Sequence, residues 1–485
     1  MEEKNKYFEK ELSTNIKTIE NIFSGDSTLR KREFSLSGIS VCLFYFDGMV
    51  NVELINESII KPLVIAKGKI IPQKKAKHIK ENILFASEVG ETSLVSEAVS
   101  SIMYGDTLLL IEESRVALKI NTKGWRTRGI SEPENERILQ GPREGFDEAA
   151  MFNVAMIRRR LQTPDFCANT VRLGKQTNTY VFICYIKGLV SETALKILKE
   201  RLSKINIDSI LDSNYITEQI SDNKSSLFKS VGSTERPDIV AARLLEGRIA
   251  LVVDSTPVVI TLPYLFSENF QSDEDYYINY KLASAGRLLR LICFFLAIGI
   301  SAVYLSLTTF HFQFLPPAFA FTVSAARMGV PFPSALECII LTVIFEILRE
   351  TGIRMSQSVG HALSIVGGLV VGQAAVEAKI VSAPMLIAVA FSGICGLMVP
   401  RLKTAVFYIR FIMIFSSALF GLFGVFSVLS VMLIAILKMQ SFGVDATLSL
   451  ERPSIQSLKD VFIRVSWLNM IKRPLIQKRN ITRKK

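Results

Sequence analysis

Three ionisable side chains stand inside otherwise apolar stretches of the second half of the chain. Arg327 ends a stretch bracketed by prolines, and Glu337 and Glu346 lie in an apolar helix expected over residues 334–350. A charge inside a membrane costs about 3 kcal/mol on insertion scales, so it usually faces a partner charge or a water-filled path. We expect Arg349 to pair with Glu346 and Arg327 to pair with Glu337. Glu337 could equally line an ion path, whereas for Glu346 the structural ion pair is favoured.

Small residues recur at every fourth position of the next apolar segment, and two polar residues follow them. The residues concerned are Gly360, Ser364, Gly367, Gly368, Gly372, Gln373 and Glu377. Small residues four apart give a helix a smooth groove that another helix can approach closely. The helix could pack through this groove against other helices of the same subunit. Alternatively, the helix could pack against copies of itself beside an aqueous path, with Gln373 and Glu377 at the mouth.

Prolines interrupt the apolar sequence before these helices. The candidate hinge residues are Pro316, Pro317, Pro331 and Pro333. They bracket a short helix-competent stretch over 315–333 that is too broken for a lipid-facing span. Irregular backbone at membrane depth needs shielding by protein, so a re-entrant or interfacial element is expected.

No catalytic or metal-binding pattern accompanies these residues. The chain has no GxGxxG, no GxxxxGK[ST] and no HExxH, and its three histidines and six cysteines form no ligand-spaced cluster. Asp47 and Asp254 end predicted strands, where turn formation explains them at least as well as ligand binding. We expect no enzyme, no cofactor and no metal.

Apolar runs over 291–310, 380–399 and 411–437 are long enough to cross a hydrocarbon core of roughly 30 Å as helices. The chain carries a net charge of +12, and the tail 438–485 is strongly basic. A basic tail fits the positive-inside rule and attraction to anionic lipid, and it lacks the aromatic platform of a nucleic-acid site. An inside tail needs an even number of crossings. Either 315–333 crosses as well, or the long run 411–437 bends back at Gly421 and Gly424.

The first half of the chain is charged, and it repeats itself. Residues 43–50 (LFYFDGMV) align with 183–190 (ICYIKGLV), and 105–112 align with 247–254 at nearly the same offset. We expect an α/β plus membrane α-helical protein, in which a cytoplasmic tandem of two similar α/β subdomains precedes a polytopic helical domain. The expected boundaries are 1–34 (amphipathic helix and lead-in), 35–140 (first subdomain), 141–167 (connecting helix), 168–270 (second subdomain), 271–287 (juxtamembrane linker), 288–437 (membrane domain) and 438–485 (basic tail).

Two further features concern this half. Phe8, Leu12, Ile16, Ile19 and Phe23 form one helical stripe, which favours docking onto a subdomain over binding a partner. The interdomain motif consists of Gly141, Pro142, Arg143, Glu144, Gly145 and Phe146. The first fifteen residues hold no apolar signal core, so the soluble part is expected to stay in the cytoplasm.

Many stretches of this chain, in order, resemble one family. They are Glu132-Pro133, 141–146 (GPREGF), Asn153, 157–160 (IRRR), 235–238 (ERPD), 247–257 (GRIALVVDSTP), 275–277 (DYY), 330–333 (VPFP), 346–352 (EILRETG) and 365–377 (IVGGLVVGQAAVE). With these motifs the chain resembles the A subunit of spore germinant receptors, the GerA family.

The resemblance implies a multi-pass protein of the inner membrane of dormant endospores. Its partners would be a permease-like B subunit, which binds the nutrient, and a lipoprotein C subunit. Copies of the A subunit would form a homo-oligomer around a path that releases monovalent cations and triggers germination.

One stretch departs from the family pattern. After 441–444 (SFGV) the family usually continues with Pro-Tyr and a second proline, but residues 445–450 here are DATLSL. A relative that acts with the dipicolinate-release machinery therefore stays open. A secondary transporter and a scaffold that only anchors other subunits are further alternatives, although the membrane half shows no inverted repeat.

Overall fold

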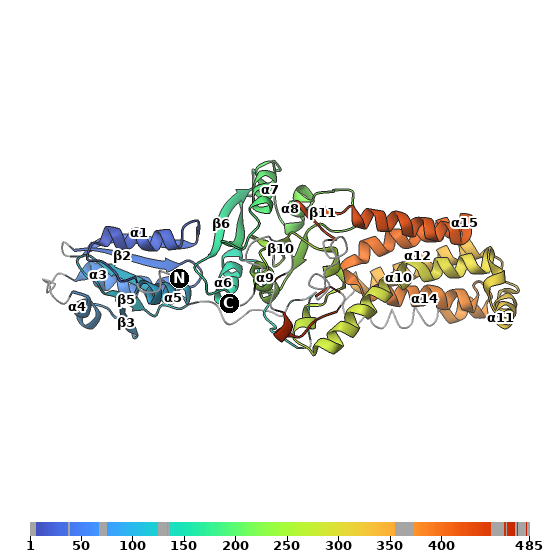
Figure 1. The fold of residues 1–485 in the computed structure, drawn as a ribbon, viewed down its shortest axis with the longest axis horizontal. Coiled ribbons are helices and arrows are strands. Elements are labelled where there is room, and N and C mark those ends of the chain that lie inside the picture. The colour runs from blue at the N-terminus through green and yellow to red at the C-terminus, as the bar shows by residue number, and fades with distance from the viewer. Residues whose placement is uncertain are drawn as a thin grey trace.

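The computed structural model describes residues 6–36, 39–66, 75–124, 133, 136, 138, 140–354, 372–447, 460–461, 463–470, 473 and 482. Along its longest axis the molecule has three parts: a first α/β layer, a second α/β layer and a helical bundle (Figure 1). The second layer lies between the other two.

The first sheet is antiparallel, in the order β1-β2-β4-β5-β3. Its strands are β1 (Leu29–Leu36), β2 (Ile39–Phe46), β3 (Val89–Thr92), β4 (Thr107–Ile111) and β5 (Ala117–Ile120). On one face pack α1 (Leu12–Ile22) and α5 (Val95–Met103), and on the other pack α2 (Val52–Ile55), a π-helical turn (Asn56–Ile60), α3 (Lys61–Ile65) and α4 (Lys75–Asn82). Both faces of the central strands are therefore covered, which explains their continuous apolar runs.

The stripe of α1 docks as its spacing predicted. Phe8, Leu12, Ile16, Ile19 and Phe23 are all buried, and they pack against the β2 and β4 side chains of the first core. The apolar stripe is thus buried inside the chain, and it is not available to bind a partner.

The second sheet has the order β6-β7-β9-β10-β8, again antiparallel throughout. Its strands are β6 (Phe166–Leu173), β7 (Thr179–Ile186), β8 (Gly232–Thr234), β9 (Ile249–Val253) and β10 (Val259–Leu262). α6 (Ala150–Arg160) and α9 (Pro237–Leu245) cover one face, and α7 (Glu192–Ser203) and α8 (Ser213–Ile220) cover the other. Position by position, this strand order is that of the first sheet.

Short 3-10 turns, η4 (Phe266–Phe270) and η5 (Asp273–Tyr276), lead from β10 into the bundle. The bundle contains α10 (Tyr280–Thr309), α11 (Pro317–Arg327), α12 (Ser334–Arg354), α14 (Ala383–Leu397) and α15 (Lys403–Leu437), with short turns η6 (Phe312–Phe314) and η7 (Pro400–Leu402). After α15 come β11 (Gln440–Ser441), β12 (Val444–Asp445) and η8 (Trp467–Asn469). α10 is central, since it packs against α12, α14 and α15.

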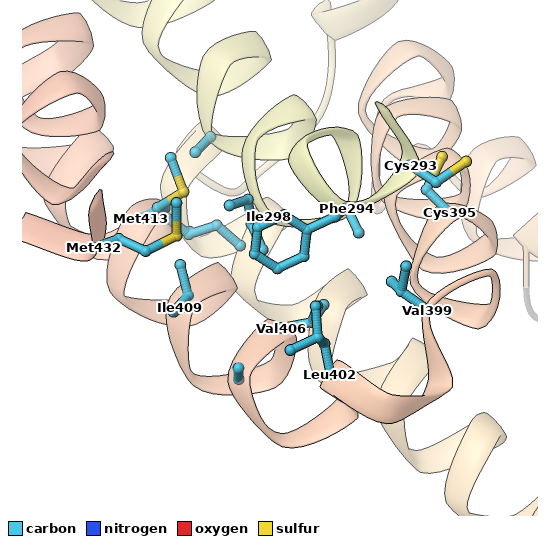
Figure 2. Close-up of a cluster of buried hydrophobic side chains, with 14 of the residues drawn as sticks. Cys293, Phe294, Ile298, Cys395, Val399, Leu402, Val406, Ile409, Met413 and Met432 are labelled. Atoms are coloured by element: carbon cyan, nitrogen blue, oxygen red, sulfur yellow. The ribbon is translucent and has the colours of Figure 1, made fainter. Parts of the chain in front are cut away.

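The bundle core is apolar. Figure 2 shows Phe294 and Ile298 of α10 among Val406, Ile409 and Met413 of α15. Cys293 and Cys395 lie beside each other in this core, and both are free thiols. They serve as small buried apolar side chains.

Within the described part of the chain, two helices are long and apolar enough to cross a membrane, Tyr280–Thr309 and Pro400–Leu437, while Ala383–Leu397 is apolar but shorter. The expected run 380–399 is thus shortened at both ends. Ser382 is the N-cap of α14, and Pro400 follows its end.

The last long helix bends back on itself. Gly421 has φ 59° and ψ −142°, which no helical residue adopts, so α15 consists of arms over 403–420 and 422–437. A Cβ on Gly424 would lie 2.2 Å from the carbonyl oxygen of Ser416, which a continuous helix could not place there. The bend that the sequence allowed at Gly421 is present in the structure, while the number of membrane crossings stays a prediction.

Candidate functional site

A layer of buried ion pairs joins the second sheet to the base of the bundle. Arg401, in η7 just before α15, donates to Asp273 at 2.8 Å and to the carbonyl oxygens of Glu268 and Gln271 at 3.0 and 3.1 Å. Arg287 of α10 donates through Nε to Asp275 at 2.9 Å. We call Glu268, Asp273, Asp275, Arg287 and Arg401 the base layer.

Local sequence fixes where these acids stand. Asp273 and Asp275 lie in η5, where Asp275 also accepts the backbone N–H of Ser272 in a capping box. Asn279 then caps α10, so its first turns carry Arg287 and Arg290 back over Asp275. Asp275 precedes α10, and Arg287 and Arg290 lie within α10. These ion pairs therefore form where the chain enters the bundle.

The C-terminal segment closes the base layer from the other side. Asp460 accepts from Arg287 at 3.0 Å and from the Tyr276 hydroxyl at 2.9 Å. Burial and the nearby Asp460 carboxylate raise the pKa of Tyr276. Tyr276 is therefore a neutral hydrogen-bond donor in this layer.

Glu268 is a fully buried acid of the base layer with several partners. It pairs with Arg243 at 2.8 Å and with Arg248, and it accepts the N–H of Leu265 at 2.7 Å. Burial alone would raise the pKa of Glu268, but the charges of Arg243 and Arg248 outweigh it and hold the pKa below the ordinary value. Glu268 is thus ionised and bound by Arg243 of α9 and by Arg248, which directly precedes β9.

This depressed pKa predicts a pH dependence. The Glu268→Gln variant should unfold at lower temperature than the parent chain at about pH 7, by an amount equivalent to about 3 kcal/mol. The difference should shrink as pH falls below about 4.5 towards the depressed pKa, because protons then bind the unfolded chain before the folded one. Thermal unfolding of the purified full chain in detergent from about pH 7 to about pH 4 tests this. A difference that stays constant with pH would contradict it.

The interdomain motif 141–146 packs against the same layer. Gly141 has φ +125°, and a Cβ there would lie 2.7 Å from the Tyr277 ring, so only glycine fits. Arg236 donates to the carbonyl of Pro142 at 2.9 Å, and Phe146 is buried in the second core. Glu144 pairs with Arg159 and Arg160 of α6. The motif therefore connects α6, α9 and the turn before α10; within it Gly145 and Arg143 lie between these contacts.

Inside the bundle, a second charge cluster joins four helices. Glu346 of α12 pairs with Arg349 as expected, and also with Arg410 of α15 at 3.0 Å. Arg410 is 1% exposed. It donates further to the carbonyls of Ala297 on α10 at 2.9 Å and Ser392 on α14 at 3.2 Å. The arginine is thus satisfied by α10, α12 and α14 at once.

The expected Glu337–Arg327 ion pair is wrong. Glu337 is fully buried, and its Oε1 accepts the backbone N–H and the hydroxyl of Ser382, each at 2.6 Å. Its Oε2 and the Nε of Arg327 are buried without hydrogen-bond partners. Ser382 caps α14, so Glu337 binds at the positive end of that helix. The start of α14, and not Arg327, is therefore the partner of Glu337.

Most of the small-residue helix, Gly360, Ser364, Gly367 and Gly368, lies outside the described residues. Gly372 is described, and a Cβ there would only touch Leu386 at 3.6 Å. Gln373 donates to Glu377 at 2.8 Å on an exposed surface. The pore assignment of this helix stays a prediction.

The four hinge prolines surround α11. Pro316 precedes it and Pro317 opens it, while Pro331 and Pro333 lie in the turn before α12. α11 lies at the end of the bundle away from the sheets (Figure 1), and most of its side chains are exposed. At about 1.5 Å per residue this helix is too short to span a membrane.

Neither acid that ends a strand belongs to a site. Asp254 accepts the N–H of Ala150 at 3.0 Å at the start of α6, and Asp47 pairs with Arg30. Among the described residues, no group of three or more His, Cys, Asp or Glu is placed to hold a metal ion.

Sequence reasoning missed Arg401, Arg410 and Glu268. Arg410 lies one residue before the apolar run taken to begin at 411, so the boundary hid it. A lone arginine flanked by apolar residues was the available signal. The base layer joins the second α/β layer to the helices through ion pairs, and the Arg410 cluster joins helices of the bundle to one another.

Nearly the whole chain is similar to known spore germination proteins. A family described as Bacillus/Clostridium GerA spore germination protein matches residues 17–476. Spore germination protein KA of Bacillus subtilis (strain 168) is 39% identical over 439 residues, covering 90% of this chain and 80% of the relative. Spore germination protein B1 of the same organism is 30% identical over 475 residues, covering 96% of each.

Two further similarities complete the comparison. A Bacillus subtilis (strain 168) protein described as uncharacterized membrane protein YfkQ is 35% identical over 466 residues, covering 96% of this chain and 90% of the relative. Among solved structures, the N-terminal domain of the A subunit of the Bacillus megaterium spore germinant receptor GerK3 is 30% identical. It covers 54% of this chain and 98% of that chain, with a TM-score of 0.44.

Proposed function

The chain belongs to the GerA family of spore germination proteins, and from that premise we propose that it is the A subunit of a spore germinant receptor. The observation that carries the proposal is the family match over 17–476, supported by relatives of at least 30% identity that are spore germination proteins. The proposed partners are a permease-like B subunit that binds the nutrient and a lipoprotein C subunit.

The proposed location is the inner membrane of the endospore, with the tandem of α/β subdomains in the cytoplasm. α10, α12, α14 and the two arms of α15 run between the two ends of the bundle. The start of α10 and both ends of α15 lie next to the second sheet, through Arg287, Arg401 and Ser441. This arrangement supports a polytopic domain whose basic tail is on the side of the sheets.

The proposed activity is release of monovalent cations through a path formed by several copies of the chain. The small-residue segment 360–372 is the proposed contact between copies, with Gln373 and Glu377 at its mouth. The base layer supports a route of control, because its ion pairs tie the turns that follow the second sheet to α10 and to η7, which directly precedes α15. A movement of the α/β part would therefore pull on the helices at their bases.

The test is potassium release from spores. Spores carrying Gly368→Leu should lose germinant-triggered potassium release, because the larger side chain holds neighbouring helices apart, while Gly368→Ala should keep most of it. Potassium in the medium is followed after germinant addition, and immunoblots check that both variants reach normal abundance. Normal release from the leucine variant at normal abundance would remove the pore assignment.

A further inference from the structure

A cavity of about 490 Å³ lies at the junction of the second sheet and the bundle. The end of α14 and the turn after it form one wall, with Leu397, Met398 and Pro400. Lys229 and the start of β8 form the opposite wall. The cavity thus has an apolar wall on the bundle side and a polar wall on the sheet side.

Cations outnumber acids around this cavity. Lys229, Arg243, Arg290 and Arg401 line it, against Glu136 and Asp273. Three of the four cations are committed to carboxylates: Arg243 to Glu268, Arg290 to Asp275 and Arg401 to Asp273.

Lys229 differs from the other three. In the part of the chain that the structure describes, no carboxylate lies within 4.0 Å of its ammonium. Lys229 lies exposed at the edge of the cavity, and partial desolvation by its surroundings together with the nearby Arg401 charge lowers its pKa. An anion in the cavity would supply the missing counter-charge for this side chain.

The two acids of the cavity do not offset this. Asp273 is bound by Arg401 at 2.8 Å, and Glu136 accepts from the Thr234 hydroxyl at 2.6 Å and the N–H of Glu235 at 3.0 Å. Burial and the nearby Asp273 raise the pKa of Glu136. Both carboxylates therefore already have partners of their own.

An exposed apolar stripe on α14 leads to the cavity. Ile387, Phe391, Ile394 and Met398 are exposed and follow one another at helical spacing along one face. Met398 and the neighbouring exposed Leu397 also line the cavity. Hydrocarbon chains lying along this stripe would place the group attached to them next to Lys229.

We propose that this cavity binds the phosphate headgroup of an anionic phospholipid from the leaflet that faces the α/β part. Lys229 pairs with the phosphate and the α14 stripe packs against the acyl chains. Basic pockets between membrane helices are suited to such headgroups, and a charge-assisted hydrogen bond to phosphate is strong when partly desolvated. The site rests on the proposed membrane placement of the bundle.

The ligand would also have a mechanical consequence. A second cavity, of about 620 Å³, shares Lys229 and Arg401 with the first. Because Arg401 belongs to the base layer and lies in η7 just before α15, a bound headgroup would stand beside the ion pair between Arg401 and Asp273 of η5. The lipid would therefore stabilise the junction.

The test measures lipid binding to the purified full chain. Native mass spectrometry in detergent counts phosphatidylglycerol and phosphatidylcholine bound to the parent chain, Lys229→Ala, Lys229→Arg and Lys204→Ala. We expect selective retention of phosphatidylglycerol, weakened about tenfold by Lys229→Ala and restored by Lys229→Arg. Lys204→Ala is the matched control, because Lys204 is exposed at the C-cap of α7 and pairs with Glu200.

The outcomes separate the alternatives. Equal retention of phosphatidylglycerol by Lys229→Ala and the parent chain would overturn the site. Thermal stabilisation by inorganic phosphate, lost in Lys229→Ala, with no selective binding of phosphatidylglycerol, would overturn the lipid as the source of the phosphate. Spores that lack potassium release while the purified chain binds lipid through Lys229 would contradict the proposed function and leave the site intact.

Discussion

Replacing Arg410 with leucine is expected to lower the free energy of unfolding of the purified chain by about 3–5 kcal/mol. Arg410 is fully buried and pairs with Glu346 at 3.0 Å, while it donates to carbonyls of α10 and α14. Leucine keeps the bulk but leaves the Glu346 carboxylate with Arg349 alone. Thermal unfolding in detergent, followed by the fluorescence of a thiol-reactive dye on the buried cysteines, measures the loss.

A matched control lies between the same two helices. Lys403 of α15 pairs with Glu350 of α12 at 3.5 Å, and both side chains are about half exposed. Lys403→Ala should cost at most about 1 kcal/mol, because solvent screens an exposed pair. The double variant Glu346→Leu with Arg410→Leu should lose less than the sum of the two single losses. Equal losses for Arg410→Leu and Lys403→Ala would refute the role of the buried cluster.

Replacing Gly421 with valine is expected to disrupt the bend of α15. Gly421 has φ 59° and ψ −142°, and a Cβ would lie 2.8 Å from the His311 ring. Valine at this position would be strained by the positive φ and would also clash with His311, so we expect the free energy of unfolding to fall by at least about 3 kcal/mol. Thermal unfolding and the yield of monodisperse protein in detergent measure it.

The bend also makes a prediction about sidedness. Lys438→Cys in the parent chain should be labelled by an impermeant thiol reagent from the same side of a vesicle as an exposed residue of the sheets. The same cysteine in the Gly421→Val chain should lose that pattern. Gly299→Ala of α10 is the control, since the nearest atom to its Cβ would be 4.0 Å away. Unchanged stability and labelling in the valine variant would exclude the bend.

The central strands could be predicted from the sequence, because each one corresponds to a short apolar run. The paired stretches 43–50 and 183–190 fall on β2 and β7, which hold the same position in their sheets. Strands buried on both faces give long apolar runs, and those runs are visible without a structure. The bend at Gly421 was also within reach, because the run 411–437 is longer than one crossing needs and holds two glycines.

Long-range pairing could not be derived in the same way. Glu346 and Arg410 are 64 positions apart, and Arg401 and Asp273 are 128 apart, so packing alone brings them together. Glu337 shows the error that follows from local reasoning. Its nearest cation in sequence is Arg327, but the free N–H at the start of α14 lies closer in space. The backbone N–H groups at the start of a helix are not marked by any charged residue in the sequence, so sequence reasoning does not identify them as partners of an acid.

The two-stranded hairpin after α15 has a consequence for how the protein is made. Phe442 is fully buried in the core under β7, β9 and α7, and Ser441 donates to Ser230 and accepts from Tyr264. A ribosome delivers the second sheet first, then every helix of the bundle, and only then Phe442. Chains fold from their N-terminal parts as they emerge. The core of the second sheet therefore receives Phe442 only after every helix of the bundle has been synthesised, so this core cannot be complete before the bundle has been made.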